Sequence, residues 1–344
     1  MSDLTLVSII IPCRNEEKFI GKCLDSIIAQ DYLKDKLDPH PKPGDTLPQV
    51  GRERGRGRNL EVLVVDGMSE DGTRDIIEEF KTTKSLRAIA KQSHGIATSL
   101  PTLAMTIKLL DNPKKITPCA LNIGIKNAQG EIIVRMDAHA GYEKDYVSKC
   151  VKYLKEYDAD NVGGVMITLP RDNAFIGKAI ATVLSHPFGV GNSVFRTGAK
   201  EPKWVDTVFG GCYKKEVFDK IGLFNESLVR SQDMEFNLRL KKTGGKILLA
   251  PDIVSYYYPK SNLKDFFIHN FEDGSWVTYP LKFGIKAFSW RHLIPLFFIL
   301  GLVGTGILGI FFSPLLWLFL FVLSSYLLVN LYHSEPLPKL NLNF

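Results

Sequence analysis

The sequence predicts an α/β protein in which a mostly parallel, Rossmann-like sheet is followed by a short hydrophobic region. Apolar runs of strand length alternate with segments of helical spacing through residues 4–137. This alternation is typical of βαβ units, in which helices cover a parallel sheet. Near the C-terminus, residues 293–332 contain no Lys, Arg, Asp or Glu. The chain has 344 residues, which is enough for one large core with appendages.

The first elements are predicted from residue types and spacing. Residues 4–12 are rich in β-branched residues and stop at Pro12, which suits a buried parallel strand. Residues 19–28 repeat apolar side chains at helical spacing after a polar, acidic start, which suits a surface helix. The predicted order is strand, helix, strand, helix, helix and strand over residues 4–12, 19–28, 60–67, 73–80, 120–130 and 131–137.

The second half of the main domain, which we expect to span residues 1–260, mixes both kinds of element. The pattern predicts helices over 144–157, 173–185 and 231–244, a strand over 246–258, and a strand, a Gly-Gly turn and a short helix within 205–222. Two segments fit no element. Residues 33–59 are rich in Pro, Gly and charge, and residues 84–115 have apolar residues without a clear period. Both are predicted to be inserted loops, whose role is left open.

The uncharged stretch 293–332 predicts a membrane anchor. It is too long for one spanning helix, which needs about 20 residues, and Ser313-Pro314 is a natural turn. We therefore predict a transmembrane hairpin over 293–312 and 314–332; the alternative is a buried helical pair in a soluble protein. Residues 261–292 combine aromatic and basic side chains, which suits helices lying in the membrane interface.

The charges around these spans predict their orientation. Lys282, Lys286 and Arg291 precede the first span, and the turn between the spans has no charge. By the positive-inside tendency, the main domain and the tail 333–344 are both predicted on the cytoplasmic face of the cell (inner) membrane. The five cysteines lack a CxxC spacing, which is consistent with reduced thiols in a cytoplasmic domain.

The charge pattern does not favour nucleic acid as a partner. The net charge is a mild +6, and part of it lies in "GRERGRGR" at residues 51–58. Such a run could touch phosphates, but it is more often a solvated loop. No G-x-G-x-x-G follows the first strand, which disfavours a dinucleotide-dependent dehydrogenase.

Polar residues follow three of the predicted strands where each ends. Asp66 and Asp137 are the main examples, and parallel strands place such ends in one crevice. Asp66 alone could equally cap the helix that follows it. Residues i and i+2 of an extended chain point the same way, so Asp137 and His139 can face one ion. A carboxylate and an imidazole suit Mn²⁺ or Mg²⁺ shared with phosphate oxygens.

The order of these motifs resembles that of family 2 glycosyltransferases. The matching stretches are "VSIIIPCRNEE", "EVLVVDGMSEDGT", "ALNIGI" with "GEIIVRMDAHA", "FGGCYKKEVFDKIGLFNE" and "SQDMEFNLRLKKTGGKILLAP". The resemblance covers about residues 4–260, apart from the two inserted loops, and it is strongest to the branch with a membrane-attached succinoglycan glucosyltransferase. It implies the GT-A nucleotide-diphospho-sugar transferase fold, a nucleotide-sugar donor that is usually UDP-linked, and inversion at the anomeric carbon.

The resemblance also implies roles for individual residues. It places Pro12, Arg14 and Glu16 around the nucleoside, lets Asp66 hydrogen-bond the uracil, and makes Asp137 and His139 the metal ligands that hold the diphosphate. It places Gly210, Gly211 and Trp276 near the acceptor. Asp233 matches the general base, although an acid at a helix start is also common for reasons of helix dipole. Gln232 stands where the family often has Glu, and the processive motif lacks its Arg near Trp276, which implies single addition.

The predicted function is therefore an inverting, metal-dependent transfer of one sugar from a nucleotide-sugar to a hydroxyl of a polyprenyl-linked acceptor, in the synthesis of a cell-surface glycan. One alternative is a polyprenyl-phosphate sugar synthase, whose acceptor phosphate is already ionised and needs no base. Another alternative is a non-catalytic membrane protein that only binds nucleotide.

Overall fold

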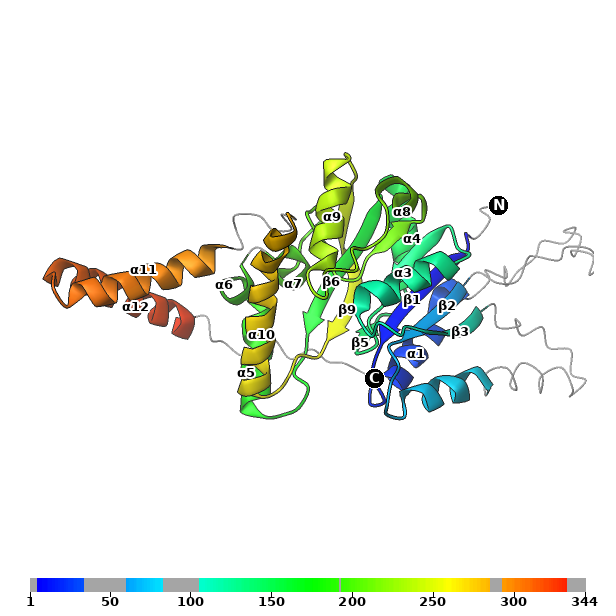
Figure 1. Cartoon of the computed structure of the whole chain (residues 1–344), viewed down its shortest axis with the longest axis horizontal. Coiled ribbons are helices and arrows are strands. Elements are labelled where there is room, and N and C mark those ends of the chain that lie inside the picture. The colour runs from blue at the N-terminus through cyan, green and yellow to red at the C-terminus, as the bar shows by residue number, and fades with distance from the viewer. Residues whose placement is uncertain (1–4, 34–59, 83–104, 192, 285–292, 333–344) are drawn as a thin grey trace, which may run out of the picture. The chain divides into compact units, whose positions relative to one another are not determined.

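The computed structural model describes residues 5–33, 60–82, 105–191, 193–284 and 293–332 (Figure 1). The chain forms two compact units. The first consists of Met1–Ile167 and Gly198–Tyr258, and the second of Thr168–Thr197 and Pro259–Phe344. Residues 168–197, which fall within the catalytic domain predicted over 1–260, are grouped with the C-terminal segment in the second unit.

One half of the sheet in the first unit is parallel. Strand β1 (Val7–Cys13) lies between β2 (Leu60–Asp66) and β4 (Ile132–Arg135), and β3 (Met105–Asp111) adds to the outer side of β2. All three pairings are parallel, with Cys13 opposite Asp66 and Asp66 opposite Asp111. The carboxyl ends of these strands are therefore aligned at one edge.

The other half of the sheet is antiparallel, so the sheet is mixed rather than mostly parallel as predicted. Its strand order continues from β4 through β8, β6, β9 and β5, and β7 pairs with β9. The pairings of β4 with β8, β6 with β8, β5 with β9 and β7 with β9 are antiparallel. An apolar run shows that a strand is buried but not which way its neighbour runs. These strands are Ala140–Tyr142 (β5), Asn161–Thr168 (β6), Lys203–Trp204 (β7), Cys212–Lys214 (β8) and Ile247–Tyr257 (β9).

The helices of the first unit lie close to their predicted positions. Gly124 shows how closely one of them packs, because a Cβ there would lie 2.4 Å from Cγ2 of Ile10 in β1. Only glycine permits this approach of helix to sheet. The elements are α1 (Ile20–Ile28), η1 (Asp31–Leu33), a helix over 73–82, α3 (Thr117–Asn127), α4 (Tyr146–Glu156), α8 (Glu216–Ile221) and α9 (Gln232–Lys242).

The prediction of one inserted loop over 84–115 is wrong for residues 105–111, which form β3. Met105, Ile107 and Leu109 pack against the core, while Lys108 Nζ forms a 2.8 Å ion pair with Glu61. The segment is an edge strand whose residues 105–110 are only partly buried, so its sequence lacks the continuous apolar run of a central strand. Residues 34–59 and 83–104, which make up most of the two predicted loops, lie outside the described residues.

The second unit is helical in its described part, and two of its helices have strongly exposed apolar faces. On α5 these are Phe175, Ile176 and Val183, and on α10 they include Phe267 and Phe271. The elements are α5 (Phe175–Ser185), α6 (Pro187–Val190), α7 (Val194–Thr197), α10 (Leu263–Thr278), η2 (Tyr279–Phe283), α11 (Ile294–Gly309) and α12 (Ser313–Tyr332).

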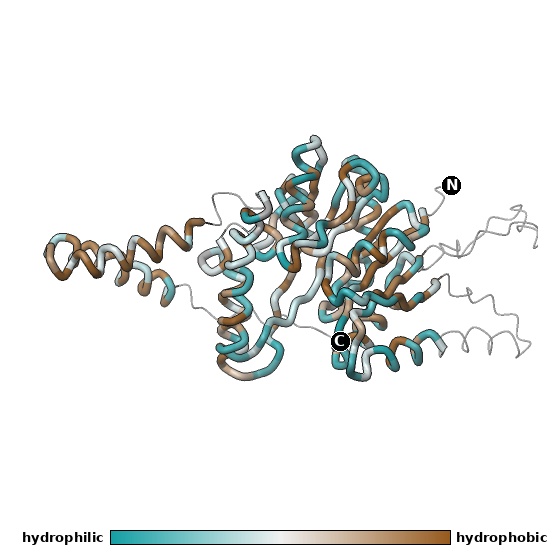
Figure 2. The backbone as a smooth tube through the Cα atoms, in the orientation of Figure 1, coloured by the Kyte–Doolittle hydropathy of each residue, from teal (hydrophilic) through white to brown (hydrophobic). Residues whose placement is uncertain are grey.

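Helices α11 and α12 form the predicted pair around Ser313, but only one reaches membrane length. Figure 2 shows hydrophobic residues along most of both helices. Among the described residues, α12 alone is long and apolar enough to cross a bilayer, and its apolar window is not buried inside the protein. Its 20 residues span about 30 Å, whereas the 16 residues of α11 span about 24 Å, less than the hydrocarbon core. The structure thus supports one of the two predicted spans.

Candidate active site

The loops that follow β1, β2 and β4 leave the sheet at the same edge. Directly after the strands, the backbone N–H of Gly67 donates to the carbonyl of Cys13 at 2.8 Å, and that of Met136 donates to Ile10 at 3.0 Å. These bonds extend the parallel ladders by one residue and hold the three loops together. Asp66 and the segment that contains Asp137 and His139 therefore emerge at one edge of the sheet, as predicted.

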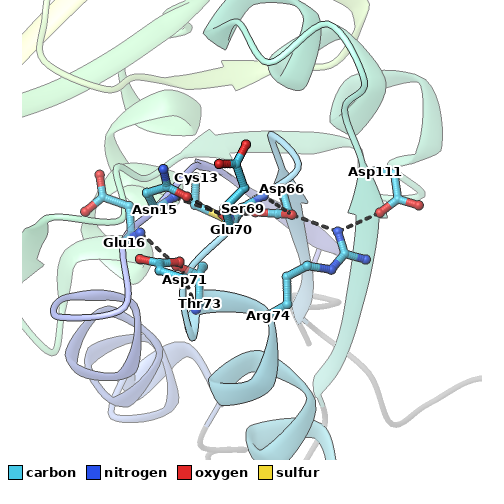
Figure 3. A network of polar contacts seen from close by, with 10 residues as sticks. All are labelled: Cys13, Asn15, Glu16, Asp66, Ser69, Glu70, Asp71, Thr73, Arg74 and Asp111. Atoms are coloured by element: carbon cyan, nitrogen blue, oxygen red, sulfur yellow. Dashed lines mark hydrogen bonds and ion pairs between the residues drawn. The ribbon is translucent and has the colours of Figure 1, made fainter.

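Asp66 is completely buried, and its carboxylate accepts hydrogen bonds from the loop and the helix that follow β2 (Figure 3). Ser69 donates to it twice, through its N–H at 3.0 Å and its hydroxyl at 2.5 Å. Arg74 donates to it at 2.7 Å and reaches Asp111 on β3 at 2.8 Å with the same nitrogen. The hydrogen bond from uracil to Asp66 that the resemblance implies stays a prediction.

The loop after β1 is tied to the loop after β2 by hydrogen bonds (Figure 3). Asn15 has a left-handed φ of 55°, and its N–H donates to the hydroxyl of Ser69 at 2.9 Å. Its side-chain oxygen accepts the N–H of Glu70 at 2.9 Å, and the N–H of Glu16 donates to Thr73 at 2.8 Å. These hydrogen bonds hold the two loops side by side.

The residues predicted around the nucleoside lie at the end of β1 and in this loop. Pro12 is the penultimate residue of β1 and is half-buried. Arg14 is exposed and lies over Gly67, where a Cβ would come within 3.1 Å of the Arg14 side chain. The carboxylate of Glu16 contacts His139, and the role of these three residues around a nucleoside stays a prediction.

His139 is held by Glu16. The distance from His139 Nδ1 to Glu16 Oε1 is 3.1 Å, and both side chains are partly exposed. A carboxylate that accepts the Nδ1 proton fixes the imidazole tautomer in which Nε2 is the lone-pair nitrogen. This is the arrangement found at many metal-ligating histidines. In the part of the chain that the structure describes, no group of three or more His, Cys, Asp and Glu side chains could hold a metal by itself.

The extended geometry assumed for Asp137 and His139 does not hold. β4 ends at Arg135, and Ala138 and His139 lie in a turn, so the strand geometry that would point Asp137 and His139 to the same side does not apply to them. Asp137 instead contacts Arg135, and its N–H donates to the phenol of Tyr142 at 2.6 Å. The predicted strand 131–137 ran two residues past the end of β4, because the buried pattern continues through Met136.

Arg135 links two predicted site residues and was missed by the sequence reasoning. Its Nε and Nη2 both lie 3.1 Å from Oδ1 of Asp137, and its Nη1 forms an ion pair with Oδ1 of Asp233. Burial opposes the positive charge of Arg135, but the two carboxylates outweigh it and raise the pKa of the guanidinium. The sequence feature that could have identified Arg135 as a site residue is a basic side chain at the last position of an otherwise apolar strand.

The Gly-Gly turn and the start of α9 complete this arrangement. Gly210 and Gly211 have φ of 68° and 106°, which confirms the predicted turn. The carbonyl of Gly211 accepts the N–H of Arg135 at 2.9 Å, and a Cβ on Gly210 would lie 2.9 Å from the carbonyl of Arg135. Asp233 lies in the first turn of α9, where a carboxylate also suits the helix dipole.

Two further side chains make contacts of their own. Glu235, two residues after Asp233 in α9, forms an ion pair with Arg239 at 2.9 Å. Trp276 belongs to α10 in the second unit, where its ring packs on Tyr279 with centroids 4.8 Å apart. Its role at an acceptor site stays a prediction.

The fold and these side chains define an α/β protein with acidic groups gathered at its strand ends. The chain belongs to glycosyl transferase family 2, whose model matches residues 8–222, and it is a glycosyltransferase. This confirms the predicted family. The α/β architecture expected of that family is also confirmed, with the mixed sheet described above.

Two curated relatives are similar over most of the chain. The dolichyl N-acetyl-alpha-D-glucosaminyl phosphate 3-beta-D-2,3-diacetamido-2,3-dideoxy-beta-D-glucuronosyltransferase of Methanococcus voltae is 31% identical over 315 residues, 89% of this chain and 83% of the relative. The succinoglycan biosynthesis protein ExoA of Rhizobium meliloti (strain 1021) is 29% identical over 268 residues, 77% of this chain and 67% of the relative.

Solved structures are similar at lower identity. TarS 1–349 from S. aureus in complex with UDP is 17% identical with a TM-score of 0.46, over 79% of this chain and 65% of that chain. The mannosyltransferase PcManGT from Pyrobaculum calidifontis in complex with GDP-Man and Mn²⁺ is 23% identical with a TM-score of 0.49, over 81% of this chain and 64% of that chain. This chain thus spans slightly less than two thirds of each solved chain.

Proposed function

We propose that this glycosyltransferase moves one sugar from a UDP-sugar to a hydroxyl of a polyprenyl-linked acceptor, with inversion and with a bound Mn²⁺ or Mg²⁺. The observation that carries the proposal is the cluster around Arg135. It brings Asp137, from the segment predicted to hold the diphosphate, and Asp233, the predicted base, onto one guanidinium. We infer that Asp137, which would help to hold the diphosphate, and Asp233, which would take the acceptor proton, belong to one site.

The reaction we propose is a single displacement. The acceptor oxygen forms a bond to the anomeric carbon from the side opposite the diphosphate, the bond from that carbon to the diphosphate breaks, and the diphosphate leaves with its electron pair. A sugar hydroxyl has far too high a pKa to react unaided, so a carboxylate must take its proton. Asp233, whose side chain is one-third exposed, is the proposed acceptor of this proton.

The donor types of Asp137 and His139, a carboxylate and an imidazole, suit a divalent cation, and these two residues are its proposed ligands. Asp137 uses only Oδ1 for its contacts with Arg135, and His139 is set by Glu16 in the tautomer suited to coordination through Nε2. Two protein ligands would leave the remaining positions to phosphate oxygens and water, as is common for Mg²⁺ and Mn²⁺ in nucleotide sites. When bound, the cation would neutralise charge on the leaving diphosphate. If UDP binds equally well with and without Mn²⁺ in calorimetry, this part of the proposal fails.

We place the lipid-linked acceptor at the cytoplasmic face of the cell membrane, as the basic residues before the first predicted span suggest, and its attachment to lipid is supported by the second unit and by the relatives. The Methanococcus voltae relative is named for a dolichyl-linked sugar acceptor, and ExoA for succinoglycan biosynthesis. The membrane-length helix α12 and the exposed aromatic side chains of α5 and α10 suit attachment to a bilayer. Extraction of the intact chain from membranes by carbonate alone would contradict attachment through α12.

The decisive test is Asp233→Asn, with Asp219→Asn as control. Asp219 lies on α8 and is exposed, so the control changes the same chemical group outside the site. With a donor panel and lipid extract, we expect D233N to reduce transfer by about 10²- to 10⁴-fold, the usual contribution of a general base, and D219N to match the parent. Full activity of D233N would instead favour the polyprenyl-phosphate sugar synthase. Metal-dependent UDP binding without transfer by the parent chain to any acceptor would favour the non-catalytic alternative.

A further inference from the structure

We propose that Arg135 is a positioning residue, which holds the carboxylate of Asp233 in the orientation needed to take the acceptor proton. This inference rests on the proposed function, because it assigns a task within the same displacement. Arg135 itself touches neither the sugar nor the acceptor in the mechanism proposed above. It acts through Asp233, to which it is linked by an ion pair across 98 positions of sequence.

The backbone of Arg135 is fixed from two sides. Its N–H donates to Gly211 at 2.9 Å, and its carbonyl lies so close to Gly210 that a Cβ there would be only 2.9 Å away. The side chain is 10% exposed, so the guanidinium has little room to adopt another position. A charged group held this firmly can set the position of a mobile carboxylate beside it.

The geometry of a guanidinium suits this task. Two of its nitrogens lie 3.1 Å from Asp137 while the third contacts Asp233, so one planar group sets the separation of two carboxylates. Without it, two negative side chains would share a partly buried region and repel each other. Asp233 is the more exposed of the two, at 33% against 15% for Asp137, and so is freer to turn toward solvent.

Helix α9 is anchored independently of Arg135. Asn237, one turn after Asp233, donates to Thr207 at 2.9 Å and accepts from the buried Asn161 at 3.1 Å. Phe236 is fully buried and stacks on Phe224 with centroids 4.5 Å apart. Removal of Arg135 should therefore leave α9 in place and release only the side chain of Asp233.

A second arginine in the same unit joins two carboxylates but serves another part of the site. Arg74 bridges Asp66 and Asp111 at the ends of β2 and β3, with distances of 2.7 and 2.8 Å. That pair of carboxylates belongs to the predicted nucleoside end. Arg135 differs because one of the two carboxylates that it contacts is the proposed base. Loss of Arg135 should therefore lower the rate of the chemical step.

The test is a double-mutant cycle between Arg135 and Asp233 in the full-length enzyme. Arg135→Met, Arg135→Lys, Asp233→Asn and the R135M/D233N double variant are compared at saturating donor, acceptor and metal. Lys241→Met is the control, because Lys241 lies on α9 and forms an exposed ion pair with Asp206. Thermal unfolding and UDP binding of each variant show that it is folded.

We expect R135M to lose about 10²-fold in kcat, within the usual range for an impaired general base. R135K should recover part of this loss, because it restores one positive charge without the planar fork. K241M should match the parent. The loss from R135M should vanish in the D233N background, since Arg135 acts through Asp233.

Two results would overturn the inference. One is a kcat for R135M equal to that of the parent, and the other is the same fold loss from R135M with and without Asp233, which would indicate a purely structural role. If R135M does not fold, the cycle is run with R135K and the same two criteria. An inactive parent enzyme on all donors would instead refute the proposed function, so the two failures are distinguishable.

Discussion

Gly211 is predicted to be required for its backbone conformation and for the space it leaves. Its φ of 106° lies in a region that L-residues rarely adopt, and a Cβ there would lie 2.6 Å from the ring of Tyr213. That ring cannot withdraw easily, because it is buried against Phe218 and Phe236, with centroids 5.4 and 5.6 Å away. Gly211→Ala should therefore combine backbone strain with overpacking.

A matched control separates the two effects. Gly244 also has a left-handed φ, 84°, but a Cβ there would meet nothing within 4 Å. Gly244→Ala should lower the free energy of unfolding through backbone strain alone, by about 1–2 kcal/mol. Gly211→Ala should add an overpacking term of about 1–3 kcal/mol, for a total of about 2–5 kcal/mol.

The assay is thermal unfolding of the full chain in detergent, followed by near-UV circular dichroism. For a folding unit of this size, about 1 kcal/mol corresponds to about 2–4 °C, so we expect Tm to fall by about 10 °C in G211A and about 4 °C in G244A. Because Gly211 also accepts the N–H of Arg135, G211A should reduce sugar transfer. Equal shifts in Tm for the two variants would refute the predicted clash with Tyr213.

Two further predictions concern ion pairs in the first unit. Hydrogen bonds from Lys114 and Asn122 lower the pKa of Glu226 to about 2 from an ordinary 4.5. The ionised Glu226 therefore stabilises the folded protein above about pH 4.5, and this stabilisation is lost as pH falls toward 2. The difference in Tm between the parent and Glu226→Gln should accordingly shrink over that range; a difference independent of pH would exclude this ion pair as its source. Glu61 is buried and accepts hydrogen bonds from Lys108, Ser8 and Gln129, so Glu61→Gln should destabilise the fold by about 2–4 kcal/mol. The exposed Glu79→Gln should change stability by less than about 0.5 kcal/mol, and equal effects of the two substitutions in urea unfolding would contradict the account of Glu61.

Positions of strands and helices were predictable because they depend on neighbouring residues. The buried runs at β1 and β2 and the helical spacing in α1 and α4 all appear near their predicted positions. The edge strand β3 was missed, since its side chains are only partly buried and its pattern includes Lys108. The length of the strand before Asp137 was overestimated, because burial continues after the ladder of β4 has ended.

The sequence by itself determined the family, the order of the motifs and the residue types brought to the strand ends. It also determined the apolar C-terminal helices, because length and composition suffice to define them. Only the tertiary structure decided that the sheet is mixed, that Glu16 contacts His139, and that Arg135 joins Asp137 to Asp233. These contacts join residues far apart in the chain, and their geometry depends on strand direction and helix packing, which no local pattern of residues encodes.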